Sequence, residues 1–388
     1  MSIRRSAAGQ ARPLPIVPPV EEDELISSWL GRTARFYGMS VSDLFDGNGV
    51  DRSISDLAAI DVGLPRAVIR PIARLLNITV DGLAKHTIAV AYPWAIGLLA
   101  RESYGGTFDH DAPLRPAVCP LCLDQQRATR GFSWLRSEWV LAWRTMCSRH
   151  SIRLIEGGSE TVHPAWQGFF GRHHCIQQAT CPAMPNGETQ RPQILPAYRS
   201  GATEAVDSRL LQIQDVLVTN AAVGKNRNSA AEDDISIVVG DVLWALTRVD
   251  RGWPDRLAYE EFALPQFDSD WHIARRRRLG PTDYTRLGVF VRHAMMAAAV
   301  VLADDPDRCP RVAGPGFSTF SELMRLLGIL TVVDANELRT RSARWPARFA
   351  RRIVPGLTPE LRRRAGRPSL QSTGYFRLLP LSLRFTGN

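Results

Sequence analysis

Cys119-Pro120-Leu121-Cys122 and Cys147-Ser148-Arg149-His150 are two ligand pairs, each with two residues between its members, separated by a 24-residue insert that contains three tryptophans. This spacing lets each pair fold as a tight knuckle that presents two side chains at one corner of a tetrahedron, the geometry of zinc in structural sites. All four positions are protein ligands, so none is left for water, and the metal would hold the fold rather than activate a nucleophile. The sequence therefore predicts a structural zinc site at Cys119, Cys122, Cys147 and His150.

Other interpretations of the cysteines stay open on the sequence alone. Free cysteines are often small buried apolar residues, so the two pairs could be unrelated thiols beside a surface histidine. A disulfide framework is another alternative, although six cysteines in 388 residues are sparse for one. Further along, His173, His174, Cys175 and Cys181 could form a second metal site. Five residues separate its two cysteines, which is not knuckle spacing, so this second site is a weaker hypothesis.

The insert between the pairs has a pattern of its own. Its tryptophans, together with Leu135, recur at roughly helical spacing, which predicts one apolar helical face. Arg136, Glu138 and Arg144 then fall on the opposite face. We expect the apolar face to pack over the knuckles as core, and a platform on which unpaired bases stack is the alternative. The tryptophans are Trp134, Trp139 and Trp143.

A helix-turn-helix pattern occurs twice in the N-terminal hundred residues. Residues 34–41 (ARFYGMSV) are echoed thirty-nine residues later by residues 73–80 (ARLLNITV). Gly or Asn can take the left-handed turn in each copy, and Ser40 or Thr79 can cap the next helix. The functional interpretation is DNA recognition by the second helix of each unit. The structural alternative is a helix hairpin packed into a small bundle, which the scarcity of long polar side chains on these second helices favours.

Four prolines within the first twenty residues fix φ and remove amide donors, which predicts an extended arm over residues 1–20. The acids at positions 21–24 follow, and we expect them at the N-terminus of a helix, where the helix dipole favours negative charge. Gly38 is expected to end that helix. The apolar positions of the helix are Leu25, Ile26, Trp29 and Leu30, with Thr33 on the same face.

The formal net charge is +9, and only Lys85 and Lys225 are lysines, so nearly all the positive charge is arginine. This balance favours a polyanionic partner, because guanidinium groups suit phosphate oxygens. Between Arg339 and Arg367 there are ten arginines and one acid. A host bias in nucleotide composition and a solvated helix face are the alternatives. The candidate contacts to a nucleic-acid backbone are Arg275, Arg276, Arg277, Arg278, Arg348, Arg351, Arg352, Arg362, Arg363 and Arg364.

From about residue 203 onward the pattern is mostly helical, with segments at 235–246 and 284–303. The latter is apolar but contains Arg292 and His293, so we expect a buried helix rather than a membrane span. The chain opens without an apolar signal core, and we expect a soluble, cytoplasmic, nucleoid-associated protein.

The predicted fold class is mainly α and multidomain. An extended Pro-rich arm (residues 1–20) leads into an N-terminal helix-turn-helix bundle (21–115). A central zinc ribbon with minor β structure (116–185) and a C-terminal helical domain with an Arg-rich end (200–388) follow. We find no Gly-rich phosphate loop, HExxH pair or nucleophile elbow in the sequence, so it predicts no catalytic residue and no enzyme.

Several of these features, taken in order, resemble the TniQ family of bacterial transposon target-selection proteins. The resemblance covers about the first 180 residues. Its motifs are Asp23-Glu24-Leu25-Ile26-Ser27-Ser28-Trp29-Leu30, Gly38-Met39-Ser40, Cys119-Pro120-Leu121-Cys122-Leu123, and Trp134-Leu135-Arg136-Ser137-Glu138-Trp139 ahead of Cys147-Ser148-Arg149-His150.

The resemblance implies a non-enzymatic accessory protein of DNA transposition. Such a protein binds DNA and acts with a separate transposase and an ATPase regulator of the same element to select or license the insertion site. The resemblance also implies structural zinc at the two ligand pairs. Ser148 stands where the family often has Pro, and Cys175 and Cys181 replace a later Cys-x2-Cys pair. A homodimer and attachment to an RNA-guided complex both stay open.

Two other functions compete with this interpretation. The first is a free-standing zinc-containing transcriptional regulator that uses the helix-turn-helix units on an operator. The second is a DNA- or RNA-modifying enzyme with zinc at its catalytic centre, which would require an open coordination position.

Overall fold

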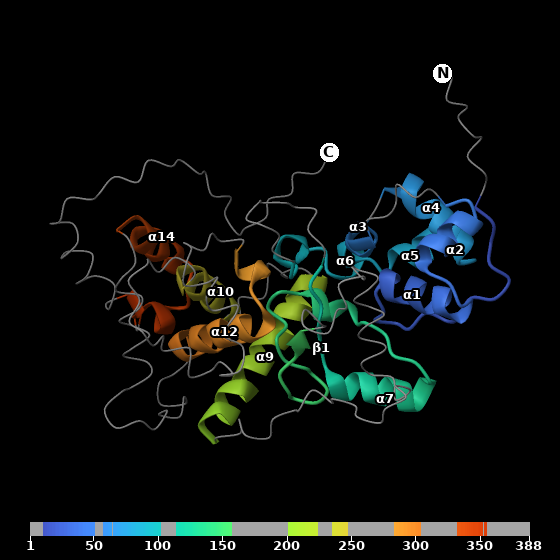
Figure 1. Cartoon of the computed structure of the whole chain (residues 1–388). Helices are drawn as coiled ribbons and strands as arrows, with labels where there is room; N and C mark the ends of the chain where they lie inside the picture. The colour runs from blue at the N-terminus through green and yellow to red at the C-terminus, as the bar shows by residue number, and fades with distance from the viewer. Residues whose placement is uncertain are drawn as a thin grey trace.

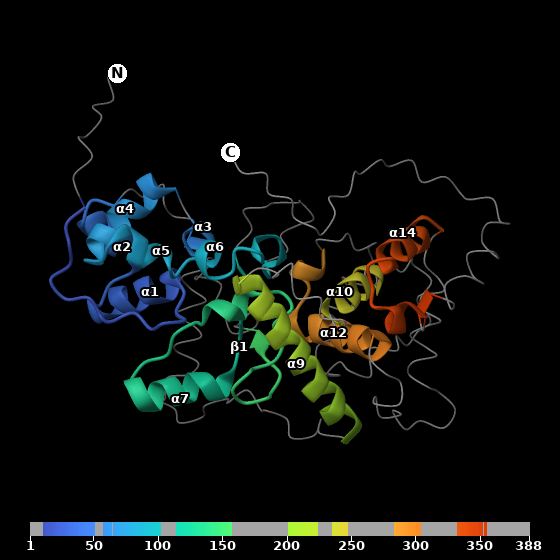
Figure 2. The ribbon, with the colours of Figure 1, turned by 180° about the vertical axis from the view of Figure 1, so that it is seen from behind.

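The computed structural model of the chain describes residues 11–50, 57–63, 65–101, 114–156, 201–223, 235–246, 283–303, 332–351 and 353–354. These residues are mostly helical and contain a two-stranded antiparallel sheet, in agreement with the predicted mainly α class. The N-terminal helices lie at one end, the C-terminal helices at the other, and the segments around the sheet lie between them (Figures 1 and 2). The division into domains stays a prediction.

The N-terminal bundle contains α1 (Ile26–Phe36), α2 (Val41–Gly47), α3 (Leu57–Val62), α4 (Arg66–Leu75), α5 (Val80–Ala84), α6 (Ile88–Ala91) and the 3₁₀ turn η2 (Ile96–Leu98). The central part contains β1 (Ala117–Val118), α7 (Pro120–Arg130), the 3₁₀ turn η3 (Ser137–Val140) and β2 (Ile155–Glu156). The C-terminal part contains α9 (Gly201–Val223), α10 (Ile235–Leu246), the 3₁₀ turn η6 (Asp283–Arg286), α12 (Val289–Ala303) and α14 (Val332–Ser342).

Both copies of the predicted turn are present. After α1, Gly38 takes a φ of +69°, and Ser40 forms a capping box in which its hydroxyl accepts from the Asp43 amide at 3.1 Å. After α4, Asn77 takes a φ of +51°, and the Thr79 hydroxyl accepts from the Gly82 amide at 3.0 Å. The second helices are short, with seven residues in α2 and five in α5.

The start of α1 is capped from a distance. Its N-cap residue, Leu25, has no side-chain acceptor, but the carboxylate of Asp61 in α3 accepts from the Ser27 amide at 2.9 Å and from the Ser27 hydroxyl at 2.5 Å. Asp61 is completely buried, and burial raises its pKa to about 7. A partner 34 residues away along the chain therefore satisfies amide donors that helix ends leave unpaired.

The acids at positions 21–24 directly precede α1, as expected, but none of them lies in its first turn. Glu24 is buried and turns back onto the helix, where it forms an ion pair with Arg32 at 2.6 Å and accepts from the Ser28 hydroxyl at 2.9 Å. Asp23 reaches outward to the central segment instead. These side chains tie the helix entry to its surroundings, because a buried charge needs a partner more than an exposed helix end needs one.

The described part of the Pro-rich arm, residues 11–20, forms no helix or strand and is held against the bundle. The Leu14 amide donates to the Leu75 carbonyl at 2.9 Å. Further along, the Trp29 indole donates to the Pro18 carbonyl at 2.7 Å and Arg32 donates to the Pro19 carbonyl at 2.8 Å. Prolines leave these carbonyls available as acceptors while removing competing amide donors.

Whereas the first residues of the insert belong to α7, the part that carries the tryptophans, residues 131–146, does not form the predicted helix. It contains η3 flanked by extended chain, and its backbone bonds to other segments replace the i→i−4 bonds of a helix. The prediction that Arg136, Glu138 and Arg144 lie on a face opposite the tryptophans was also wrong, because all three side chains are buried with them. The three indoles are also buried, which favours core over a stacking platform. The cross-segment bonds include Leu25 N to Leu135 O (3.0 Å), Ser137 N to Asp23 O (2.7 Å) and Ala142 N to Leu98 O (2.9 Å).

The C-terminal helices pack on one another and on the central part. α12 lies against α9 and α10, and α14 lies against α10. The prediction that the apolar segment is a buried helix agrees with α12, in which Arg292 and His293 are buried despite their polarity. No helix within the described residues is both long and apolar enough to span a membrane.

Replacing Asp61 with Asn is expected to flatten the pH dependence of stability. The pKa of Asp61 is about 7 in the folded protein and about 3.9 for an unfolded aspartate, so between these values the folded state binds more protons than the unfolded state. Wild-type stability therefore falls as pH rises through this window. Thermal unfolding from pH 5 to 8 should show a smaller fall in Tm for Asp61→Asn, and the exposed Glu22→Gln serves as matched control. Equal slopes for wild type and Asp61→Asn would contradict the assignment.

Candidate metal centre

The first ligand pair is built into the start of α7. Strand β1 leads into Cys119, which is the N-cap of the helix, and Pro120 occupies the first helical position, where its missing amide proton costs nothing. The Cys119 sulfur accepts from the Cys122 amide at 3.4 Å. This turn directs both thiols to the same side, so the first knuckle is a helix start rather than a β-turn.

The second ligand pair lies in a tight loop between Met146 and Arg153, which form an isolated antiparallel bridge. The Cys147 amide donates to the Ile152 carbonyl at 2.8 Å, and the Ser151 amide donates to the Cys147 carbonyl at 2.9 Å. Ser151 takes a φ of +52°, which reverses the chain just after His150. Pairing of β2 with β1 then brings this loop beside the first knuckle.

The four predicted ligand atoms converge as the sequence analysis expected. All lie within 4.8 Å of one another, and Cys119, Cys122 and Cys147 are free and buried. His150 presents Nδ1, which lies 3.4 Å from the Cys119 sulfur, 3.3 Å from that of Cys122 and 3.6 Å from that of Cys147. The sulfurs of Cys122 and Cys147 are 3.6 Å apart, well beyond the roughly 2 Å of a disulfide.

These separations fit a tetrahedral zinc ion. With Zn–S near 2.3 Å and Zn–N near 2.05 Å, tetrahedral geometry requires about 3.8 Å between two sulfurs and about 3.6 Å between sulfur and nitrogen. The donor set of three thiols and one imidazole also has the softness that zinc prefers over calcium or magnesium. The cluster could therefore hold a metal ion with four protein ligands.

The cluster also favours loss of a thiol proton. Hydrogen bonds from the Cys119 and Cys122 thiols, aided by His150, lower the pKa of Cys147. Hydrogen bonds with Cys122 and Cys147, together with burial, raise the pKa of Cys119. Three sulfurs in contact cannot all ionise without a cation between them, because like charges at this distance repel strongly. A divalent cation removes that obstacle, and its binding releases protons.

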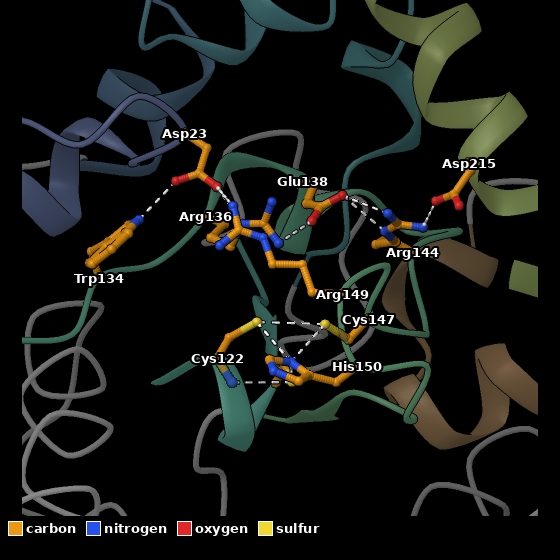
Figure 3. Close-up of polar contacts among 11 residues, drawn as sticks. Asp23, Cys122, Trp134, Arg136, Glu138, Arg144, Cys147, Arg149, His150 and Asp215 are labelled. Carbon is orange, nitrogen blue, oxygen red and sulfur yellow. Dashed lines mark hydrogen bonds and ion pairs between the residues drawn. The ribbon is translucent and has the colours of Figure 1, made fainter. Parts of the chain in front are cut away.

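A chain of five charges, of which the middle three are buried, lies beside the cluster and joins three parts of the molecule (Figure 3). Asp23, from the entry to α1, pairs with Arg136, whose Nη1 lies 2.7 Å from Glu138 Oε1. Glu138 Oε2 in turn lies 2.8 Å from Arg144 Nη2, and Arg144 Nη1 lies 2.6 Å from Asp215 on α9. The Trp134 indole donates to Asp23 at 2.8 Å. The alternation of sign gives every charge of this Asp23–Asp215 chain a partner on at least one side.

Side chains of the C-terminal helices form hydrogen bonds with the segment that enters the second knuckle. The side-chain carbonyl of Gln214 accepts from the amides of Thr145 (3.2 Å) and Met146 (3.1 Å), directly before Cys147. His293 on α12 places Nδ1 3.2 Å from the Thr145 hydroxyl and Nε2 3.2 Å from Asp207. Burial and the charge of Arg153 lower the pKa of His293, which favours the neutral imidazole. The candidate ligand cluster is thus braced by α9 and α12.

Of the other predicted site residues, the structure describes only two. The second candidate metal group (His173, His174, Cys175 and Cys181) lies outside the described residues. Of the arginine candidates, Arg348 and Arg351 are described and exposed, and the Arg348 guanidinium lies 4.6 Å from the centroid of the Phe349 ring. The remaining candidates, Arg275 to Arg278, Arg352 and Arg362 to Arg364, lie outside the described residues.

Some arginines have an internal role that the sequence analysis missed. Arg341, inside the basic C-terminal stretch, is buried, pairs with Asp241 at 3.3 Å and Glu337 at 2.9 Å, and lies over the Trp244 ring. An acid four residues before an arginine on a helix is the one local signal for this, and it points only to Glu337. Part of the arginine excess therefore stabilises the fold rather than a complex.

The family model described as TniQ matches residues 15–154. That range includes both helix-turn-helix units, the Trp-rich insert and all four residues of the candidate ligand cluster. The match confirms the resemblance that the motifs carry. No curated protein gives a match to the chain.

Replacing Cys147 with Ser is expected to remove the bound metal and destabilise the protein together, because the ligand cluster ties the insert at both ends. Purified wild type should carry about one equivalent of metal by elemental analysis, and the variant should carry far less and unfold at lower temperature. Ser148→Ala, at an exposed position inside the same loop, is the matched control and should keep both properties. A folded Cys147→Ser protein that retained a full equivalent would refute the site.

Replacing Glu138 with Gln is expected to destabilise the protein by about 3–5 kcal/mol, because it removes the charge between two buried guanidinium groups. Asp215→Asn cuts the same chain at its end, where the carboxylate is 49% exposed, and should cost about 1 kcal/mol or less. Urea unfolding of the two variants measures the difference. Similar small losses in both would show that the Asp23–Asp215 chain contributes little to stability.

Proposed function

We propose, from the membership of residues 15–154 in the TniQ family, that this transposition-associated protein is a non-enzymatic adaptor that helps to select or license the insertion site. The observation that carries the proposal is the position of the Cys119–Cys122–Cys147–His150 cluster, which falls inside the family region. Four protein ligands around one ion leave no position for water or substrate, which supports a structural and not a catalytic role.

Zinc is the ion that we propose for this cluster. The three cysteines and His150 would hold it, and it would supply a cross-link between the start of α7 and the loop before β2. The residues around the cluster hold it in place. Gln214 and His293 bond to the segment before the second knuckle, and the Asp23–Asp215 chain connects the central part of the protein to the bundle and to α9. This supports a rigid bracket on which partners assemble. A second zinc at His173, His174, Cys175 and Cys181 remains a proposal.

The partners that we propose are DNA, the transposase and the ATPase regulator of the same element. A homodimer and an RNA-guided complex are further candidates that the family membership allows. Exposed Arg348 and Arg351, together with the basic stretches at 275–278 and 362–364 and Arg352, are proposed DNA contacts. The net charge of +9 supports a polyanionic partner, and we expect the protein to act in the cytoplasm at the nucleoid.

The alternative of a free-standing transcriptional regulator has less support. Its second helices would have to enter the major groove, yet α2 exposes Asp43 and Asp46 and α5 exposes Asp81. Carboxylates on so short a helix repel phosphates and leave few side chains that reach base edges. The helix-turn-helix units therefore support packing and backbone contact better than base recognition.

The decisive experiment is an insertion assay in cells that supply the cognate transposase, ATPase regulator and a marked donor element. Removing this protein is expected to lower the frequency of insertion or scatter the insertion positions, since target selection would be lost while strand transfer resides elsewhere. Complementation with wild type should restore both, Ser148→Ala should do the same, and Cys147→Ser should not. Sequencing of the insertion junctions measures both quantities.

An unchanged insertion frequency and an unchanged distribution of positions in the absence of the protein would contradict the proposed function. A DNase footprint at one promoter with no effect on insertion would instead support the transcriptional regulator. Turnover of a nucleic-acid substrate that is lost in a folded Cys147→Ser variant would support a zinc enzyme.

A further inference from the structure

The two helix-turn-helix units differ in what their first helices expose. Helix α1 buries eight of its eleven residues, because it lies between the bundle and the Trp-rich insert. Helix α4 lies on the side of the bundle turned away from α7 in both views (Figures 1 and 2). One of its faces is buried through Ile69, Ile72 and Leu75, and the other faces solvent.

The solvent face of α4 is a row of arginines. Arg66, Arg70 and Arg74 are all exposed and stand four residues apart, and no residue of α4 is acidic. Residues four apart lie on one side of a helix at intervals of about 6 Å along its axis, so the three guanidinium groups form a continuous stripe about 12 Å long. We call this stripe the α4 ridge. Its spacing is readable from the sequence, but the sequence analysis did not single it out.

The α4 ridge is largely free of internal partners. Arg66 pairs with Asp81 of α5 at 2.7 Å, but both side chains are more than three-quarters exposed, so water and salt weaken this pair. The structure gives Arg70 and Arg74 no ion pair among the described residues. This separates them from Arg32, Arg136, Arg144 and Arg341, which are buried against carboxylates.

We propose that the α4 ridge contacts the phosphate backbone of duplex DNA, so that the second helix-turn-helix unit holds DNA through its first helix without reading bases. In helix-turn-helix proteins the first helix crosses the backbone, which is the position of α4 in its unit. Guanidinium groups bind phosphate oxygens with two parallel hydrogen bonds, and a row of them suits a regularly charged strand. Helix α5 carries Asp81 and only five residues, so it adds no base-reading side chains.

This inference rests on the proposed function in requiring that the protein binds DNA. The test compares Arg70→Gln/Arg74→Gln with Arg130→Gln/Arg209→Gln, which removes the same charge from α7 and α9. Binding of the full chain to a 30-bp duplex is measured from about 50 to 200 mM salt, with circular dichroism as the check on folding. The ridge variant should lower the slope of log K against log salt by about 1.8, which is about 0.9 for each lost phosphate contact. The control should leave the slope near that of wild type.

Asp81→Asn provides a test in the opposite direction. It removes the carboxylate that competes with phosphate for Arg66, so it should tighten binding and should have no such effect in a protein that also carries Arg66→Gln. Equal loss of slope in the ridge and control variants would overturn the proposal in favour of a diffuse charge effect. Loss of binding to RNA of equal length, but not to duplex DNA, would overturn it in favour of an RNA contact.

Failure of the inference and failure of the proposed function give different results. If wild type binds duplex DNA and directs insertion while the ridge variant keeps the full salt slope, only the α4 assignment is wrong. If wild type binds no duplex DNA at any salt concentration tested, the DNA-binding part of the proposed function fails, and the α4 assignment fails with it.

Discussion

Convergence of three sulfurs and one imidazole nitrogen is the constraint on which the middle of this protein depends. The cluster fixes the start of α7 and the loop before β2, so both ends of the Trp-rich insert are held in place. Residues 131–146, which run from the end of α7 to the second knuckle, bond to neighbouring segments through their backbone and so have no freedom to coil into a helix. The insert therefore packs its indoles inward and carries the contacts that unite the bundle with the C-terminal helices.

Arg136, Glu138 and Arg144 are buried, and each of these charges needs a partner of opposite charge. A lone guanidinium transferred from water to the interior loses several kcal/mol, which its partners offset only when they are close and correctly oriented. The alternation along Asp23, Arg136, Glu138, Arg144 and Asp215 meets this condition. Such a chain tolerates few alternative packings, because any shift leaves a charge unpaired. It thereby specifies how the helix bundle, the candidate ligand cluster and α9 pack together.

Local chemistry made part of this structure predictable. The ligand spacing fixed the cluster, and the turns at Gly38 and Asn77 with their capping residues fixed two helix boundaries, because each feature acts within a few residues. The remainder depends on distant partners. Asp61 caps a helix 34 residues away, and the insert forms bonds across more than a hundred residues. Periodicity predicted a helix there because spacing alone does not distinguish a buried helical face from an irregular segment buried on all sides.

The duplicated units illustrate how one local pattern acquires two roles. Both copies form the same turn and cap, yet α1 is enclosed by the insert and α4 is not. The surface of α1 is therefore used for packing, whereas α4 exposes a row of arginines to solvent. A backbone contact of this kind orients DNA but carries no sequence information. Choice of target would then have to come from other surfaces of the protein or from its partners, which fits an adaptor better than an autonomous reader of an operator.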